Sequence, residues 1–261
     1  MDHRASFQVP AEAYDRHVGR YSPALAKHLC DHAALRAGDR ALDVGCGPGG
    51  LTAELAERLG PAHVAAVEPS ASFAEACAAR LPGVDVRVAS AESLPFADGD
   101  FDAVLSQLVV NFLPDGPAGL AEMRRVTRQG GSVSAAVWDY SGEMTLLRVF
   151  WEAAAAVDPA TRAADESHAL YITPASLRDL WASARLADVR VEPAVVPAKY
   201  DGFDDLWAPF QAGVGPAGAL VNSMPPDLQV AVADEMRQRL GVGSEPFRLT
   251  ARAWMVTGRT E

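Results

Sequence analysis

The sequence predicts an α/β fold in which a doubly wound, mostly parallel sheet of seven strands has an antiparallel last strand and helical lid insertions. Three features predict it. Short apolar runs alternate with helical patterns over the first half of the chain, as in βαβ units. Residues 40–50 place a glycine-rich turn between the first such run and the first helix. The chain closes with strand-like residues 247–259, where dinucleotide reductases usually continue with βαβ units.

Residues 40–50 read RALDVGCGPGG, an apolar run followed by four glycines. The run fits a strand that is buried on both faces of a parallel sheet. Leucines spaced four apart over residues 51–59 predict the helix that follows. A strand, a glycine-rich turn and a helix begin a nucleotide-binding βαβ unit, because glycine lets a ligand approach the backbone and adopts φ > 0 freely. We therefore expect Gly45, Cys46 and Gly47 to contact a ligand.

The ligand class depends on Asp43. The spacing Gly45-x-Gly47-x-x-Gly50 also satisfies the dinucleotide fingerprint, so the glycines alone leave the ligand open. Asp43 stands two residues before the first glycine, at the carboxyl end of the strand and directed toward the ligand crevice. A carboxylate there repels a pyrophosphate and attracts an ammonium or a sulfonium. S-adenosylmethionine carries both cations and no phosphate, and the sequence therefore favours it over a nicotinamide.

A second acidic residue follows the next apolar run, HVAAVEPS. Glu68 lies 18 residues after Gly50 and could accept hydrogen bonds from both ribose hydroxyls. This suits S-adenosylmethionine and NAD equally, so Glu68 indicates an adenosyl ligand without distinguishing the two. Pro69 adjoins it and is placed in the same ligand-binding set.

Three segments together resemble a known family: LDVGCGPG, VEPS at residues 67–70, and AESLPF at residues 91–96. They are similar to the class I S-adenosylmethionine-dependent methyltransferases, and to their small-molecule branch around the ubiquinone/menaquinone-biosynthesis C-methyltransferases. The likeness covers residues 14 to about 139. It implies a Rossmann-like sheet, S-adenosylmethionine as cofactor, and in-line displacement of its methyl group by a small-molecule acceptor.

The resemblance also implies roles for residues outside the glycine-rich turn. Tyr14 and Arg20 match an aromatic residue and an arginine that lie near the methionine end of the cofactor. Ser90, Ala91 and Glu92 stand where related enzymes contact adenine, although many relatives carry an acid in place of the serine.

The fourth expected strand, within residues 101–112, would present Gln107 to the methionine moiety. In-line displacement needs mainly proximity and alignment, because the sulfonium is already a good leaving group. No catalytic residue is therefore assigned. The conceivable bases, none with a supporting spacing, are His17, Asp139, Tyr140 and His168.

No metal site is expected. His28 and His32 share a helix face, but Cys30 projects from a different face and no second ligand cluster appears.

The rest of the sequence predicts an N-terminal cap, two lid insertions and further helices and strands. The expected domains are an N-terminal helical cap over residues 1–38 and a methyltransferase domain over residues 39–261, with lid insertions near 141–172 and 201–245. The expected elements are a helix over 70–81 capped by Ser70, a strand over 84–90, a helix ending at Gly130-Gly131, a strand over 131–140, a helix from Pro174, a strand over 186–196, and an edge strand over 247–259.

The composition narrows the partners. Lys and Arg total 23 against 34 Asp and Glu, a formal charge of −11. Such a chain repels phosphate backbones and anionic membrane surfaces, so neither nucleic acid nor a membrane is expected. No apolar run reaches the ~18 residues of a membrane span, and no signal pattern opens the chain. Three separate cysteines suit a reducing cytoplasm. We expect a cytoplasmic monomer or homodimer acting on a small molecule.

Two alternatives to a methyltransferase remain open. One is a nicotinamide-dependent oxidoreductase, against which Asp43 and the missing later βαβ unit argue. The other is a non-catalytic protein that binds an adenosyl ligand. No G-x-S-x-G, H-E-x-x-H or P-loop motif occurs, which argues against hydrolase, zincin and P-loop chemistry.

Overall fold

The computed structural model describes residues 11–261. The chain divides into two compact units, each described separately below. Among the described residues, unit 1 comprises residues 11–21, Asp139–Ala169 and Val195–Arg252, and unit 2 comprises Ser22–Trp138, Leu170–Ala194 and Ala253–Glu261.

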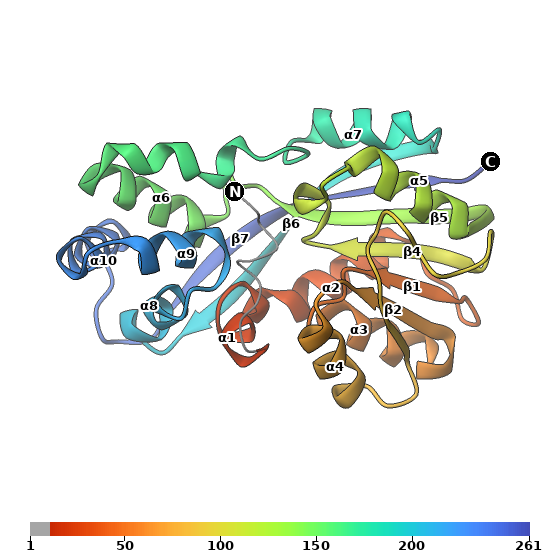
Figure 1. The fold of residues 1–261 in the computed structure, drawn as a ribbon, viewed down its shortest axis with the longest axis horizontal. Helices are drawn as coiled ribbons and strands as arrows, with labels where there is room; N and C mark the ends of the chain where they lie inside the picture. Colours follow the sequence, from red (N-terminus) through yellow and green to blue (C-terminus); the bar gives the residue numbers. More distant parts are fainter. Residues whose placement is uncertain (1–10) are drawn as a thin grey trace. The chain divides into compact units, whose positions relative to one another are not determined.

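A seven-stranded sheet forms the framework of unit 2 (Figure 1). Its strand order is β3-β2-β1-β4-β5-β7-β6. The strands are β1 (Ala41–Val44), β2 (Val64–Glu68), β3 (Asp85–Val88), β4 (Phe101–Gln107), β5 (Thr127–Trp138), β6 (Ala187–Tyr200) and β7 (Phe247–Arg259), of which β6 and β7 run on into residues of unit 1. Strands β1 to β5 pair in parallel, and β7 runs antiparallel to β5. The predicted fold class is confirmed.

Helices cover both faces of this sheet. Helix α2 packs on α3 and helix α5 packs on α7, and Figure 1 shows the two pairs on opposite sides of the strands. The helices of unit 2 are α2 (Ser22–His32), α3 (Gly50–Leu59), α4 (Ala71–Arg80), α5 (Gly116–Val126) and α7 (Pro174–Ser183), with short 3-10 turns η3 (Pro61–His63) and η4 (Val110–Phe112). The sheet is therefore doubly wound, as the alternation of strand and helix patterns predicts.

The core of unit 2 lies around its central strands. Every residue of β1 and β2 is buried, which explains their continuous apolar runs. Leu42 and Phe101 are completely inaccessible, and burying each such side chain contributes about 2 kcal/mol. Trp181 of α7 is also buried, and its indole N–H donates to the carbonyl of Val133 at 3.0 Å. This bond fastens α7 to β5.

Unit 1 is mainly helical and has an aromatic interior. Phe150 and Phe210 stack with ring centroids 4.7 Å apart, and Trp207 stacks on Phe210 at 5.4 Å. Helix α6 packs on α10, and α8 packs on α9. The elements are α1 (Ala11–Arg16), η2 (Val18–Tyr21), α6 (Thr145–Val157), η5 (Pro159–Ala164), η6 (Glu166–His168), α8 (Phe203–Gln211), α9 (Gly215–Ser223) and α10 (Pro226–Leu240).

The end of helix α5 differs from the prediction. The helix stops at Val126 rather than at Gly130-Gly131, and β5 starts at once with Thr127. The pairing of β4 with β5 shifts register early in β5, and Gly130 adopts φ 74° there. The two glycines thus form a bulge inside the strand, a position that glycine favours for the same conformational reason as a helix end.

Two further expectations are wrong. Strand β7 is not an edge strand, because it lies between β5 and β6. Its burial alternates only over its first half and becomes nearly continuous in the second, where it pairs with β5. Ser70 occupies the N-cap position of α4, but its hydroxyl makes no cap bond and instead contacts the hydroxyl of Ser72 at 3.0 Å.

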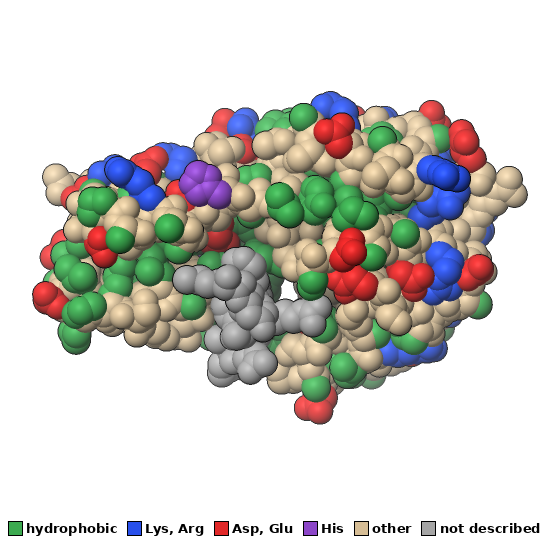
Figure 2. Space-filling view, turned by 45° about the horizontal axis from the view of Figure 1, so that its top comes forward, with side chains coloured by type: hydrophobic (Ala, Val, Ile, Leu, Met, Phe, Trp, Pro, Cys, Tyr) green, Lys and Arg blue, Asp and Glu red, His purple; other side chains and the backbone are tan. Residues whose placement is uncertain are grey.

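The surface bears mixed charges. On the face drawn in Figure 2, acidic and basic side chains are interspersed among neutral ones. Across residues 11–261, the longest and most apolar helices still fall short of what a membrane crossing requires.

Candidate functional site

The expected ligand-binding residues of unit 2 gather at one edge of its sheet. Asp43, Glu68 and Gln107 lie in the carboxyl-terminal parts of β1, β2 and β4, and these strands are neighbours in the sheet. The crevice at the carboxyl ends of parallel strands is where open α/β sheets bind ligands. The structure therefore brings these three predicted residues to a single edge.

The glycine-rich turn follows β1 directly. The backbone N–H groups of Gly45 and Cys46 both donate to the carbonyl of Val67, at 2.8 and 3.0 Å, which ties the turn to β2. Gly45 has φ 77°, and a Cβ there would lie 2.5 Å from a methyl carbon of Val109. Gly47 has φ 53°, and no described atom lies within 4 Å of where its Cβ would be. A side chain at position 45 would clash with Val109, whereas the space beside Gly47 is open among the described residues. The ligand contacts of Gly45 and Gly47 stay predictions.

Asp43 lies beneath the turn. Its side chain is fully buried. Oδ2 accepts a hydrogen bond from the Thr52 hydroxyl at 2.7 Å, and Oδ1 has no hydrogen-bond partner among residues 11–261. Burial raises the pKa of Asp43 to about 7, and the bond from Thr52 opposes this rise. The carboxylate thus has one oriented oxygen and one unsatisfied oxygen.

Glu68 accepts hydrogen bonds from two backbone N–H groups. Its Oε2 accepts from the N–H of Gly47 at 3.0 Å, and its Oε1 accepts from the N–H of Ser70 at 2.9 Å. Burial raises its pKa, and both backbone bonds oppose the rise. A carboxylate oxygen can accept two bonds, so each oxygen retains one site for a ligand hydroxyl. Pro69 next to it is exposed.

Gln107 contacts the first residue of α2. Its Nε2 donates to the Ser22 hydroxyl at 2.6 Å, and its Oε1 is buried without a hydrogen-bond partner in the described chain. A Cβ on Gly50 would lie only 2.2 Å from the same Ser22 hydroxyl oxygen. Sequence reasoning missed Ser22, whose partner Gln107 lies 85 residues away, and Thr52, an uncharged helix residue that no motif marks.

The segment after β3 has an internal hydrogen bond. The Ser90 hydroxyl donates to Oε2 of Glu92 at 2.7 Å, and Ala91 between them is buried. Oε1 of Glu92 is also buried and lacks a hydrogen-bond partner within residues 11–261. Ser90 therefore orients Glu92, which presents the unsatisfied acceptor.

Cys46 faces the protein interior. It packs with Ala66 and Cys77 in a buried cluster, and its thiol donates to the carbonyl of Gly47 at 3.5 Å. The thiol of Cys77 in turn lies 3.8 Å from the Thr52 hydroxyl oxygen. A ligand contact of Cys46 stays a prediction and would come from its backbone. Within residues 11–261, no group of three or more potential ligand side chains could hold a metal ion.

Tyr14 and Arg20 belong to unit 1. The Arg20 guanidinium binds both carboxylate oxygens of Asp205, at 3.0 and 3.1 Å, and lies over the Tyr200 ring at 4.2 Å. It also donates to the carbonyl of Lys199 at 2.6 Å. The Arg20 guanidinium, which the resemblance places near the methionine end of the cofactor, thus already binds the carboxylate of Asp205 in its own unit. The ligand contacts of Tyr14 and Arg20 stay predictions.

Two of the conceivable bases of unit 1 are unsuited to that role. His17 is buried, and desolvation followed by the charge of Arg20 lowers its pKa to about 3. Asp139 is buried and accepts from the Nε of Arg252 at 2.8 Å and from the N–H of Glu143 at 3.1 Å.

Glu166 is a titratable group that sequence reasoning missed. It is buried, and its Oε2 accepts from the indole N–H of Trp151 at 3.1 Å. Burial raises its pKa to about 7, with the bond from Trp151 opposing. No local sequence pattern marks it, because its partner lies on another element.

Comparisons with known proteins agree with this arrangement. Residues 42–135 match the family model described as a methyltransferase domain. A malonyl-[acyl-carrier protein] O-methyltransferase from Erwinia billingiae is 33% identical over 128 residues, covering 49% of this chain and 50% of that protein. The chain spans about half the length of the curated relatives it matches.

Solved structures share the fold. The YcgJ protein of Bacillus subtilis matches with a TM-score of 0.59 and 18% identity, covering 90% of this chain and 97% of its own. Geranyl diphosphate C-methyltransferase from Streptomyces coelicolor matches with a TM-score of 0.51 and 19% identity, covering 91% of this chain and 79% of its own. Residues 42–135 thus resemble a methyltransferase domain, and the strand order together with these matches shows that the chain has a Rossmann-like methyltransferase fold.

Proposed function

We propose that the chain is an S-adenosylmethionine-dependent methyltransferase that transfers a methyl group to a small-molecule acceptor by in-line displacement. One observation carries the proposal: Asp43, Glu68 and Gln107 gather at one sheet edge beside the glycine-rich turn. Asp43 and Gln107 each have a buried, unsatisfied oxygen. Leaving such an acceptor unpaired costs about 1–3 kcal/mol, which a ligand with donors would recover. A ligand with an ammonium, a sulfonium and a diol matches this set.

The proposed roles follow from the charges. Asp43 and Gln107 would accept from the methionine end, where the ligand is cationic and a nearby carboxylate is attractive. Glu68 would accept from the ribose hydroxyls, and the space at Gly47 would admit the ligand to the backbone. When bound, S-adenosylmethionine supplies an activated methyl group on a good leaving group. The protein's contribution is then alignment and exclusion of water, and no general base is assigned.

Several finer points are part of the proposal. The acceptor is a small molecule rather than nucleic acid, because the net charge of −11 opposes phosphate backbones. The three cysteines are free thiols, which supports a cytoplasmic location. We also propose a monomer or homodimer, lids near 141–172 and 201–245, and kinship with the ubiquinone/menaquinone C-methyltransferase branch. The helical cap expected over residues 1–38 is proposed too, although its first ten residues lie outside the described part of the chain.

Calorimetric titration tests the cofactor. We expect the wild-type protein to bind S-adenosylmethionine and S-adenosylhomocysteine and not NADH. Asp43→Ala should weaken binding of S-adenosylmethionine by roughly tenfold or more, about 1.4 kcal/mol. Asp31→Ala is the control, since Asp31 is exposed and pairs only with a surface arginine. Binding of NADH in preference would refute the proposal in favour of an oxidoreductase.

A transfer assay tests catalysis. Radiolabelled S-adenosylmethionine with a panel of phenols, amines and enolisable carbonyl compounds should yield a labelled product with wild type and less with Asp43→Ala. Cofactor binding without transfer to any acceptor class would favour the non-catalytic alternative.

A further inference from the structure

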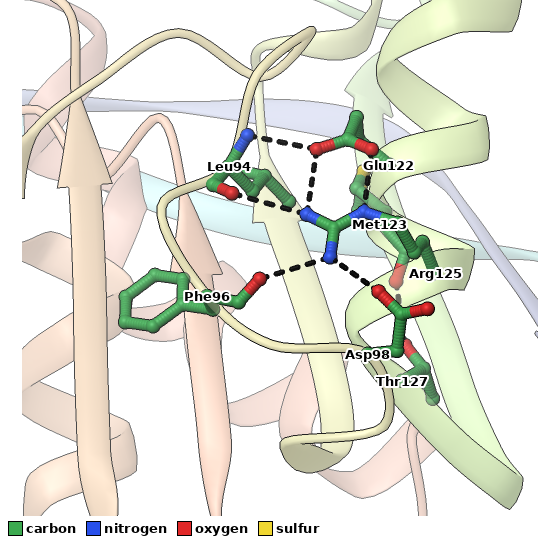
Figure 3. A network of polar contacts seen from close by, with 7 residues as sticks. All are labelled: Leu94, Phe96, Asp98, Glu122, Met123, Arg125 and Thr127. Carbon is green, nitrogen blue, oxygen red and sulfur yellow. Dashed lines mark hydrogen bonds and ion pairs between the residues drawn. The ribbon is translucent and has the colours of Figure 1, made fainter.

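Arg125 of α5 holds the loop that follows β3 (Figure 3). Its guanidinium donates to the carbonyls of Leu94 at 3.0 Å and Phe96 at 2.9 Å. It also donates to Asp98 at 2.7 Å and to both oxygens of Glu122 at 2.6 and 2.8 Å. Arginine has five N–H donors, and these five bonds use all of them. This degree of satisfaction fixes the guanidinium, and with it the two loop carbonyls.

Glu122 also binds the loop. Its Oε2 accepts from the N–H of Leu94 at 2.9 Å, so the Glu122–Arg125 pair binds both backbone polar groups of that residue. The side chain of Asp98 is 83% exposed, and its ion pair therefore adds little. The bonds to Leu94 and Phe96 are the ones that shape the loop.

The start of this loop adjoins the candidate ribose site. The N–H of Ala89 donates to the carbonyl of Glu68 at 3.2 Å, because β3 and β2 are neighbours in the sheet. The loop therefore begins beside the strand end that carries Glu68, within reach of a base attached to a ribose bound there. The buried, unsatisfied Oε1 of Glu92 lies in this loop.

Helix α5 also passes close to the loop at a second place. A Cβ on Gly119 would lie 3.6 Å from the Cβ of Ala91 and 2.9 Å from a methyl carbon of Leu113. The helix thus lies close to the loop at Ala91 and binds it at Leu94, on either side of Glu92. The position of Glu92 consequently depends on α5.

We propose that Arg125 and Glu122 are positioning residues that hold the loop of residues 90–98 in the shape that recognises adenine. Glu92 would accept a hydrogen bond from the exocyclic amine of adenine. The bonds from Arg125 and Glu122 keep the loop ordered before the ligand binds, so that the binding free energy is not reduced by the entropy cost of ordering the loop. This inference rests on the proposed function.

The test compares two ligands that differ at one position of the base. S-adenosylhomocysteine carries an amine at position 6 of the purine, and S-inosylhomocysteine carries an oxygen there, which cannot donate to Glu92. We expect wild type to prefer the amine by about tenfold in Kd measured by calorimetry. Arg125→Lys keeps the charge and loses the planar fork. It should reduce this preference to about twofold or less, with Glu122→Gln intermediate.

The matched control is Arg128→Lys. Arg128 is exposed and pairs with Asp102, outside the loop, so its variant should keep the wild-type preference. A general loss of structure would weaken both ligands equally and leave the ratio unchanged, which would overturn the inference. If circular dichroism shows that Arg125→Lys does not fold, Glu122→Gln provides the test. An unchanged ratio of the two Kd values in Glu122→Gln would then overturn the inference. Failure of wild type to bind S-adenosylhomocysteine would refute the proposed function instead.

Discussion

Thr52, on the first turns of α3, donates its hydroxyl proton to Oδ2 of Asp43 at a distance of 2.7 Å. Both side chains are fully buried. The bond crosses from the helix to the end of β1 beneath the glycine-rich turn and leaves Oδ1 of the carboxylate for another donor. Thr52 therefore belongs to the candidate site, although it is an uncharged helix residue and does not lie at the end of a strand as Asp43, Glu68 and Gln107 do.

Replacing Thr52 by Val removes the hydroxyl at nearly constant volume. Oδ2 of Asp43 then loses its donor inside the protein, which we expect to lower the free energy of unfolding by about 1–3 kcal/mol. Affinity for S-adenosylmethionine should fall by roughly fivefold or more, because the carboxylate is no longer oriented. Urea unfolding and calorimetry measure the two effects. Thr52→Ser keeps the donor and should resemble wild type; equal behaviour of the Ser and Val variants would contradict this account.

Stability should depend on pH through Asp43. Burial raises its pKa from 3.8 to about 7 in the folded state, so the folded chain holds a proton that the unfolded chain releases above pH 4. Stability is then lost as pH rises between about 4 and 7. Asp43→Asn should flatten this decline in urea unfolding measured from pH 4.5 to 8, while leaving the contributions of Glu68 and Glu166 in place. An identical slope in wild type and variant would show that Asp43 ionises normally.

The same titration affects cofactor binding with the opposite sign. An ionised carboxylate attracts the sulfonium and ammonium, so affinity for S-adenosylmethionine should increase from pH 6 to pH 8. The increase should disappear in Asp43→Asn.

Arg252 should be a large contributor to the stability of unit 1. Its Nε and Nη2 bind Oδ2 of Asp139, whose side chain is 5% exposed. Arg252→Met leaves that carboxylate buried without its cation, which we expect to cost about 3–5 kcal/mol in urea unfolding. Arg148→Met, which breaks an exposed pair with Glu152, is the control and should cost less than about 1 kcal/mol. Similar losses in the two variants would contradict the assigned importance of burial.

The local parts of the fold were predictable from sequence. The apolar run at residues 41–44, the glycine-rich turn and the acid at Glu68 are contiguous patterns, and the structure gives each the expected secondary structure and place. The helix starting at Pro174 was equally clear, and Thr173 caps it with a reciprocal bond to Ser176.

Features that depend on tertiary pairing were not predictable. The two glycines of β5 have the sequence signature of a helix end, and only the pairing with β4 makes them a bulge. Glu166 bonds to Trp151 of another helix 15 residues earlier, and Arg125 bonds to the carbonyl of Phe96 29 residues earlier, so no local spacing rule identifies them. The contact of Gln107 with Ser22 spans 85 residues and has the same cause.

The position of Ser22 in its contact with Gln107 leaves no room for a side chain at residue 50, and this can be tested. A Cβ on Gly50 would lie 2.2 Å from the Ser22 hydroxyl oxygen and 3.1 Å from its Cβ. Gly50→Ala should therefore displace Ser22 from Gln107, lowering the free energy of unfolding by about 1–3 kcal/mol as overpacking does. Ser22→Gly removes both clashing atoms, so Gly50→Ala in that background should be neutral or slightly stabilising. The four proteins of this cycle, compared by urea unfolding, should show a coupling energy of at least about 1 kcal/mol between the two sites. Additive effects would mean that the Ser22 side chain does not restrict the size of residue 50.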